Sequence, residues 1–180
     1  MSDAVTLGGS YSYLQDYIDL VMQMDRKAFC SRVTAPVLVS ETRKKPLSFG
    51  AGVTLTTDGA QGQHLLHLGH KQQVFEIRAR KPDPLGQIML GRMDECDLVV
   101  ADDTISSRHA AFQQDRESGT FQVKDLSSRN GTKVNGNQVD PAKTIDLTNG
   151  DNLLFGDVAF VFFKPEGLYD ALESSYKKSR

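Results

Sequence analysis

A series of short apolar runs fills residues 71–164 and constrains the fold more than any other feature of the sequence. In the first run, "VFEIRAR", apolar and charged residues alternate, which is the two-residue period of a half-buried strand. Glycine, aspartate, asparagine and serine separate the later runs, which are "GQIMLG", "DLVV", "HAAFQQ", "TFQVKDL", "TKVNG", "NLLFG" and "VAFVFF". Asn135-Gly136 and Gly156-Asp157 indicate tight hairpins of types I′ and II′. Many short strands with frequent turns predict an all-β sandwich or barrel.

Residues 1–32 predict one amphipathic helix. In "SYLQDYIDLVMQMDRKAF" apolar side chains recur at intervals of three and four and form one stripe, made of Leu14, Tyr17, Val21, Met24 and Ala28 with Ile18 beside it. Ser12 is the expected N-cap. We interpret this helix as packed on the domain behind it, with a docking or dimer helix as the alternative. We expect the sandwich to fold without residues 1–31.

The rest of the chain divides into three parts. Residues 33–70 form an irregular segment with possible strands or a hairpin, because "APVLVSE" is typical of a short strand and Asp58-Gly59 of a turn. Residues 71–164 form the β domain. Residues 165–180 predict a C-terminal helix in which Leu168, Leu172 and Tyr176 share a face.

Charge and composition exclude several classes of protein. The net charge of −2 lacks the basic excess of a general nucleic-acid binder. The longest apolar run, "VAFVFF", is too short to span a bilayer, and no secretory signal is recognisable. Two cysteines do not make a disulfide framework. We therefore expect a cytoplasmic protein without nucleic-acid or membrane partners.

Three polar stretches between the predicted strands carry the candidate chemistry: "LGRMDECDLVV", "DDTISSRHAAF" and "DLSSRNGTKVNG". Gly91-Arg92, Ser106-Ser107-Arg108-His109 and Asn130-Gly131-Thr132, in this order and spacing, resemble the forkhead-associated (FHA) domain over about residues 71–164. The resemblance implies an FHA-type β-sandwich, here with additional N-terminal and C-terminal helices, that binds phosphothreonine through loops at one end.

The resemblance also implies roles for individual residues. Arg92 and Ser106 would contact the phosphate, and Ser107, Arg108, Arg129 and Asn130 would line the rest of the phosphopeptide site. Asn130 would grip the backbone of the bound peptide. His109 would hold its loop in shape, with Gly91 and Gly131 as structural residues at the site. Arginine at position 129 departs from the small hydroxyl residue frequent in relatives, so the local peptide preference stays open.

Elementary chemistry agrees with this interpretation. A phosphoryl group carries about −1.5 to −2 charge at neutral pH and three strong acceptor oxygens. Arginine offers a permanently charged, forked donor, and serine hydroxyls add shorter-range donors. The tripeptide Ser-Ser-Arg occurs twice, at residues 106–108 and 127–129, separated by one hairpin of strand. Because a hairpin returns the chain to the end it left, both copies are predicted to face one anion.

Other interpretations of these residues are weaker. Ser106 or Ser107 with His109 as base would suggest an enzyme, but no strand–nucleophile–helix elbow is present. His64, His67 and His70 would suggest zinc, but they alternate across a strand and no cysteine lies at a ligand spacing.

We therefore predict a protein that is not an enzyme, has no cofactor and no metal, and recruits a phosphothreonine-containing partner, such as a Ser/Thr kinase or its substrate. The alternative is a phosphate-independent assembly protein that uses the sandwich and the N-terminal helix as an interface.

Overall fold

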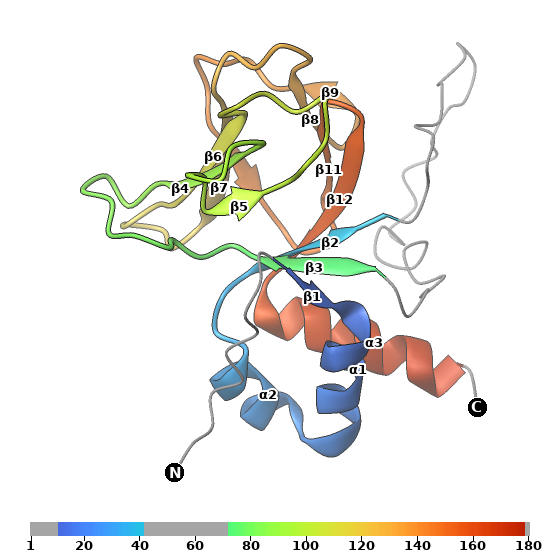
Figure 1. The fold of residues 1–180 in the computed structure, drawn as a ribbon. Helices are drawn as coiled ribbons and strands as arrows, with labels where there is room; N and C mark the ends of the chain where they lie inside the picture. Colours follow the sequence, from blue (N-terminus) through green and yellow to red (C-terminus); the bar gives the residue numbers. More distant parts are fainter. Residues whose placement is uncertain (1–10, 42–71, 179–180) are drawn as a thin grey trace.

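The computed structural model describes residues 11–41 and 72–178, which form two β-sheets packed face to face and a helical layer (Figure 1). The larger described sheet has the order β1-β3-β2-β12-β11-β8-β9, made of β1 (Ser12–Tyr13), β2 (Val37–Ser40), β3 (Gln73–Glu76), β8 (Thr132–Val134), β9 (Asn137–Gln138), β11 (Asn152–Phe155) and β12 (Val158–Phe163). The smaller has the order β10-β7-β6-β4-β5, made of β4 (Ile88–Gly91), β5 (Leu98–Val99), β6 (Ala110–Gln114), β7 (Phe121–Asp125) and β10 (Ile145–Leu147). The predicted β-sandwich is confirmed.

The central strands of the larger sheet are buried on both faces. In β12, Phe160 and Phe162 belong to the core between the sheets, whereas Val161 and Phe163 belong to a second core on the opposite face. Successive side chains of a strand point to opposite faces, so a continuous apolar run such as "VAFVFF" fits a strand that is covered on both sides. Strands β2 and β3 divide their side chains between the same two cores.

Three helices cover the outer face of the larger sheet: α1 (Leu14–Gln23), α2 (Arg26–Arg32) and α3 (Pro165–Lys178). Figure 1 shows them gathered on the side of β1, β2 and β3 that faces away from the smaller sheet. Their buried side chains close the second core, among them Leu14, Ile18, Phe29, Leu168 and Leu172. The N-terminal and C-terminal extensions therefore share one core with the sheet.

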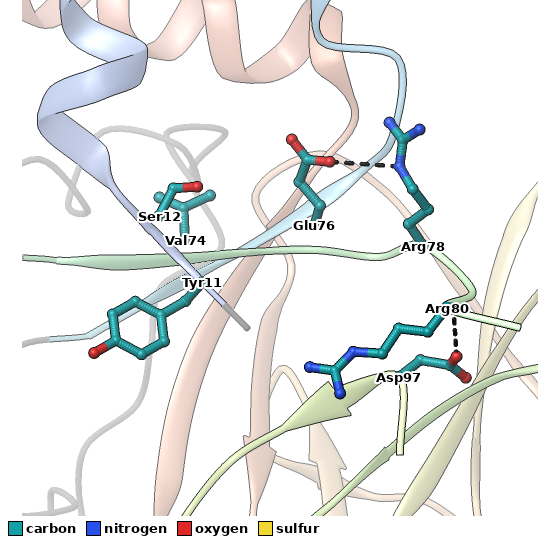
Figure 2. A pocket seen from close by; sticks show the side chains of 7 residues that line it. All are labelled: Tyr11, Ser12, Val74, Glu76, Arg78, Arg80 and Asp97. Atoms are coloured by element: carbon teal, nitrogen blue, oxygen red, sulfur yellow. Dashed lines mark hydrogen bonds and ion pairs between the residues drawn. The ribbon is translucent and has the colours of Figure 1, made fainter. Parts of the chain in front are cut away.

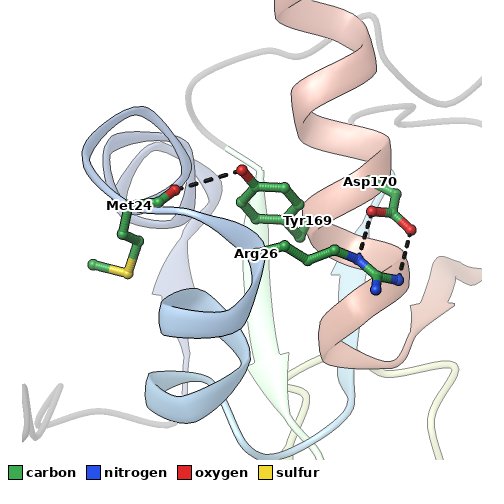
Figure 3. Close-up of polar contacts among 4 residues, drawn as sticks. All are labelled: Met24, Arg26, Tyr169 and Asp170. Carbon is green, nitrogen blue, oxygen red and sulfur yellow. Dashed lines mark hydrogen bonds and ion pairs between the residues drawn. The ribbon is translucent and has the colours of Figure 1, made fainter.

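Polar contacts join the N-terminal helices to α3 (Figure 3). Nε and Nη2 of Arg26 donate to the two carboxylate oxygens of Asp170 at 2.9 and 3.0 Å. The hydroxyl of Tyr169 donates to the Met24 carbonyl oxygen at 3.5 Å, and its ring lies 5.5 Å from that of Phe29. Because both members of the ion pair are more than half exposed, it adds little free energy, and apolar packing holds the layer.

The N-terminal segment differs from the single helix that the spacing predicts. The backbone is extended at Met24 and Asp25, and the Asp25 carboxylate accepts the Ala28 N–H at 2.8 Å as the N-cap of α2. This local cap competes with continuation of the helix, and it turns Ala28 outward while Phe29 becomes fully buried. The prediction of Ser12 as an N-cap was also wrong, because Ser12 pairs with Val74 in the sheet.

The predicted strands from "GQIMLG" to "VAFVFF" are present, as are the strand in "APVLVSE" and the C-terminal helix. The two predicted hairpin turns are present too, with φ of 50° and 83° at Asn135-Gly136 and 57° at Gly156. The side chain of Tyr176, the turn at Asp58-Gly59 and the three histidines at positions 64, 67 and 70 lie outside what the structure describes.

Strand β2 comes from the segment predicted to be irregular, yet it lies between β3 and β12 in the middle of the larger sheet. Residues 37–40 are thus an integral part of the sandwich. In the described ranges, none of the helices combines the length and apolar character that crossing a bilayer demands.

Candidate functional site

The three polar stretches identified in the sequence meet at one end of the sandwich. They lie in the loops β4–β5, β5–β6 and β7–β8, and hydrogen bonds to Ser106 tie them together. The N–H of Arg92 donates to the Ser106 carbonyl oxygen at 3.0 Å, and the N–H of Arg129 donates to Oγ of Ser106 at 2.9 Å. Ser106 therefore anchors both other loops, and the two Ser-Ser-Arg copies lie together as the hairpin argument requires.

His109 holds this arrangement from beneath. The residue is fully buried, and its ring meets that of Phe155 edge-on at 5.7 Å. Nδ1 accepts the Ser106 N–H at 3.1 Å, so the proton lies on Nε2, which donates to the Gly131 carbonyl oxygen at 3.0 Å. Burial lowers the pKa of His109 below its ordinary 6.5, outweighing the hydrogen bond to Gly131 and the charge of Asp125, which raise it. The ring is thus a neutral crosslink between two loops.

The same geometry removes the support for a serine nucleophile. To act as the general base for a serine, a histidine needs a free ring nitrogen within hydrogen-bonding distance of the serine hydroxyl. Both ring nitrogens of His109 are bonded to backbone groups, and the ring has no exposed surface.

A buried carboxylate that the sequence did not reveal supports the β7–β8 loop. Asp125 accepts from the N–H of Ser128 at 2.9 Å and from the hydroxyls of Ser128 and Thr132, each at 2.6 Å. Burial pushes the pKa of Asp125 upward, but these hydrogen bonds outweigh it and leave the pKa below its ordinary 3.8. The spacing Asp-x-x-Ser, typical of a side-chain-capped turn, was the available signal.

Thr104 is a second residue that supports the loops, and the sequence did not predict this role. Its hydroxyl donates to Asp102 at 2.6 Å and accepts the N–H of Asp157, which lies in the β11–β12 turn, at 3.0 Å. Its carbonyl oxygen accepts from the Asn130 side-chain amide at 2.7 Å. Asn130 therefore bridges two loops through one N–H of its side-chain amide.

The two structural glycines permit close approach of these loops. A Cβ at Gly91 would overlap the Ser107 carbonyl oxygen, so a larger residue would push β4 away from the β5–β6 loop. Gly131 has φ of +80°, a conformation that L side chains rarely adopt, and this presents its carbonyl oxygen to His109.

The loops enclose an open hollow of about 340 Å³. It is lined by Arg92, Asp103, Thr104, Ile105, Ser106, Ser107, Arg108 and Arg129. Five of the six predicted phosphopeptide residues thus line one hollow, and Asn130 lies beside it on the β7–β8 loop. The one ion pair found at this hollow among the described residues joins Nη1 of Arg92 to Asp103 at 3.8 Å, between exposed side chains. The hollow presents three guanidinium groups and one carboxylate, which suits an anion.

A smaller hollow of about 130 Å³ lies beside β1 and β3 and has a different charge balance (Figure 2). Arg78 there lies 3.5 Å from Glu76, and Asp97 accepts the backbone N–H of Arg80 at 2.6 Å. Its lining has two arginines and two carboxylates, so this surface offers an anion no net attraction. In residues 11–41 and 72–178 no cluster of histidine, cysteine or carboxylate side chains is arranged to hold a metal ion.

Comparison with known proteins identifies the domain. The family model described as the FHA domain matches residues 88–156. The glycogen accumulation regulator GarA of Mycolicibacterium smegmatis is 44% identical over 72 residues, which are 40% of this chain and 42% of that protein. An oxoglutarate dehydrogenase inhibitor of Corynebacterium diphtheriae is 39% identical over 74 residues, which are 41% of this chain and 48% of that protein. The chain thus matches less than half the length of these relatives.

Among solved structures, the FHA domain of yeast Dun1, in complex with a doubly phosphorylated peptide, is 27% identical and covers 71% of this chain and 72% of that one, with a TM-score of 0.45. An overlap at that score adds nothing to the assignment, which rests on the sequence match.

Proposed function

Because residues 88–156 of this chain are an FHA domain, we propose that the protein is a phosphothreonine-dependent binding module that recruits a partner phosphorylated by a Ser/Thr kinase. The observation that carries the proposal is the hollow that presents Arg92, Arg108 and Arg129 beside the Ser106 and Ser107 hydroxyls. Fixed cations and hydroxyl donors converging on one exposed point are what phosphate recognition needs.

The contacts of Ser106 support a direct role in holding the phosphate. Its Oγ accepts the Arg129 N–H, and a hydroxyl that accepts one hydrogen bond still has its own proton to donate. Its backbone is fixed twice, by His109 and by Arg92. A donor that is already fixed in space loses little conformational entropy when the ligand binds.

Arg92 would be the principal phosphate ligand. In the free protein its guanidinium faces Asp103 at 3.8 Å, and both side chains are exposed, so the interaction is weak and easily exchanged. A phosphate that carries about −1.5 to −2 charge offers Arg92 a stronger, forked partner. Ser107 and Arg108 would line the phosphate side of the site, and Arg129 and Asn130 would meet the flanking peptide.

The test is fluorescence anisotropy with degenerate peptide libraries that carry phosphothreonine, phosphoserine or unmodified threonine. We expect micromolar binding to the phosphothreonine library alone. Arg92→Ala should weaken it about ten- to a hundredfold, since charge-assisted hydrogen bonds are worth about 1.5–3 kcal/mol each. The matched control is Arg116→Ala, because Arg116 is exposed in the β6–β7 turn at the opposite end of the sandwich.

Unchanged affinity in the Arg92 variant would refute the site. Equal binding of phosphorylated and unphosphorylated libraries, or binding of neither, would instead favour the phosphate-independent assembly function, with the helical layer as the next surface to test.

A further inference from the structure

The hollow at the FHA loops holds more positive charge than one phosphothreonine neutralises. Three guanidinium groups line it, from Arg92, Arg108 and Arg129, and they come from three different loops. Against them stands one carboxylate, Asp103, which is fully exposed. This local excess contrasts with the net charge of −2 of the whole chain.

Two other acidic residues nearby are already engaged in hydrogen bonds. Asp97 accepts the N–H groups of Arg80 and Met89 at 2.6 and 2.8 Å. Asp102 accepts both the N–H and the hydroxyl of Thr104. Among the residues that the structure describes, neither Arg108 nor Arg129 has a carboxylate within ion-pair distance.

Binding of a phosphate removes the weak compensation that Asp103 provides. Asp103 and the phosphate are both negative and would share Arg92, so the exposed carboxylate turns into solvent when the phosphate arrives. Three arginine charges then face a group of about −1.5 to −2, and at least one positive charge is left without a partner.

The positions of the arginines indicate where that surplus lies. Arg92 and Ser106 lie on the two loops that share the bond from the Arg92 N–H to the Ser106 carbonyl. Arg129 lies on the third loop, and its backbone, not its side chain, bonds Ser106. Its guanidinium is thus available to a ligand group next to the phosphate, as is that of Arg108.

We propose that the preferred ligand carries a second negative charge close to the phosphothreonine, read by Arg108 and Arg129. This inference rests on the proposed phosphopeptide function and adds the class of peptide. The second charge comes either from an aspartate or glutamate side chain or from a second phosphorylated residue, and the experiment separates these sources.

The experiment uses the full chain and one phosphothreonine peptide with otherwise neutral flanks. Each position from three residues before to three residues after the phosphothreonine is varied separately. At each position, three peptides carry asparagine, aspartate or phosphoserine. At one or two positions we expect aspartate to bind about two- to fivefold tighter than asparagine, the range that an exposed ion pair supports. That gain should shrink as salt is raised. A larger gain for phosphoserine at the same position identifies a second phosphate as the better ligand, and equal gains identify a carboxylate as sufficient.

The variants Arg108→Gln and Arg129→Gln assign the effect, and Arg116→Gln is the charge-matched control. Both site arginines are exposed, so these variants are expected to keep the thermal midpoint of the parent protein, which is measured alongside. The aspartate gain should disappear in at least one site variant and persist in the control.

If no position favours aspartate over asparagine, or if the gain persists in both site variants, the inference is refuted while neutral phosphothreonine peptides still bind. If no phosphothreonine peptide binds at all, the proposed function fails together with it.

Discussion

Replacing His109 by alanine tests how the site is built. The ring is fully buried and bonds a backbone N–H on the β5–β6 loop, at 3.1 Å, and a backbone carbonyl on the β7–β8 loop, at 3.0 Å. Alanine would leave the Ser106 N–H and the Gly131 carbonyl without partners and would open a cavity beside Phe155.

The expected cost follows from these contacts. Each buried polar group left unsatisfied costs about 1–3 kcal/mol, and removing a large buried ring from a core costs about 3–5 kcal/mol where relaxation is partial. Because the two loops are exposed at their tips, water can reach the freed groups. We therefore expect the free energy of unfolding to fall by about 3–5 kcal/mol, not by the full sum.

The assay is urea unfolding of the full chain, combined with phosphopeptide affinity below the unfolding transition. Two further variants test the two hydrogen bonds of the His109 ring one at a time. The amide of His109→Asn can present an acceptor near the position of Nδ1. The amide of His109→Gln can present a donor near the position of Nε2. Asparagine should recover more of the peptide affinity than glutamine, because it restores the bond that fixes Ser106. A loss under about 0.5 kcal/mol for alanine, the range usual for a surface change, or equal affinities for all three variants, would refute the crosslink.

Two further predictions concern the fold and its pH dependence. The shared core reverses the expectation from the sequence that the sandwich folds without residues 1–31. Removing residues 1–32 takes away β1, α1 and α2 and exposes the second core. Buried side chains of this kind contribute about 1.5–3 kcal/mol each against a typical total stability of about 5–15 kcal/mol. We therefore expect calorimetry to show no cooperative unfolding, whereas an unchanged transition would show that the sandwich folds alone. The folded-state pKa of His109 lies below 6.5, so as the pH falls the unfolded chain takes up the extra proton before the folded chain does. The contribution of neutral His109 to the free energy of unfolding should therefore be fully present above pH 6.5 and be lost as the pH falls below that value. Thermal midpoints at pH 7.5, 6.5 and 5.5 check this, and an equally steep pH dependence in His109→Asn would assign it to another group.

Local patterns predicted the strands and turns because each depends on neighbouring residues. The two-residue alternation and the pairs Asn135-Gly136 and Gly156-Asp157 specify strands and hairpins without reference to the rest of the chain. The meeting of the two Ser-Ser-Arg loops followed from the same logic, since one hairpin separates them.

Long-range packing explains what the sequence did not predict. The break at Asp25 depends on the competition between a side-chain cap and a continuing helix, and Phe29 reaches the second core only because of that break. Nothing local to "APVLVSE" indicates that β2 lies in the centre of a sheet covered on both faces.

The supporting polar residues of the site were missed for a related reason. Asp125 and Thr104 are ordinary turn residues in the sequence, and their importance comes from burial and from partners on other loops. Asn130 was predicted to grip the peptide backbone, and the additional bond from one N–H of its amide to the Thr104 carbonyl oxygen was not foreseen.

The most direct test of the central claim is a titration of the isotopically labelled full chain with phosphothreonine peptide, followed by amide NMR shifts. We predict that the largest shifts fall on Arg92, Ser106, Ser107 and Arg129, and that unphosphorylated peptide leaves these amides in place. Shifts confined to the helices α1, α2 and α3, or equal shifts with both peptides, would contradict the assignment of a phosphate site to these loops.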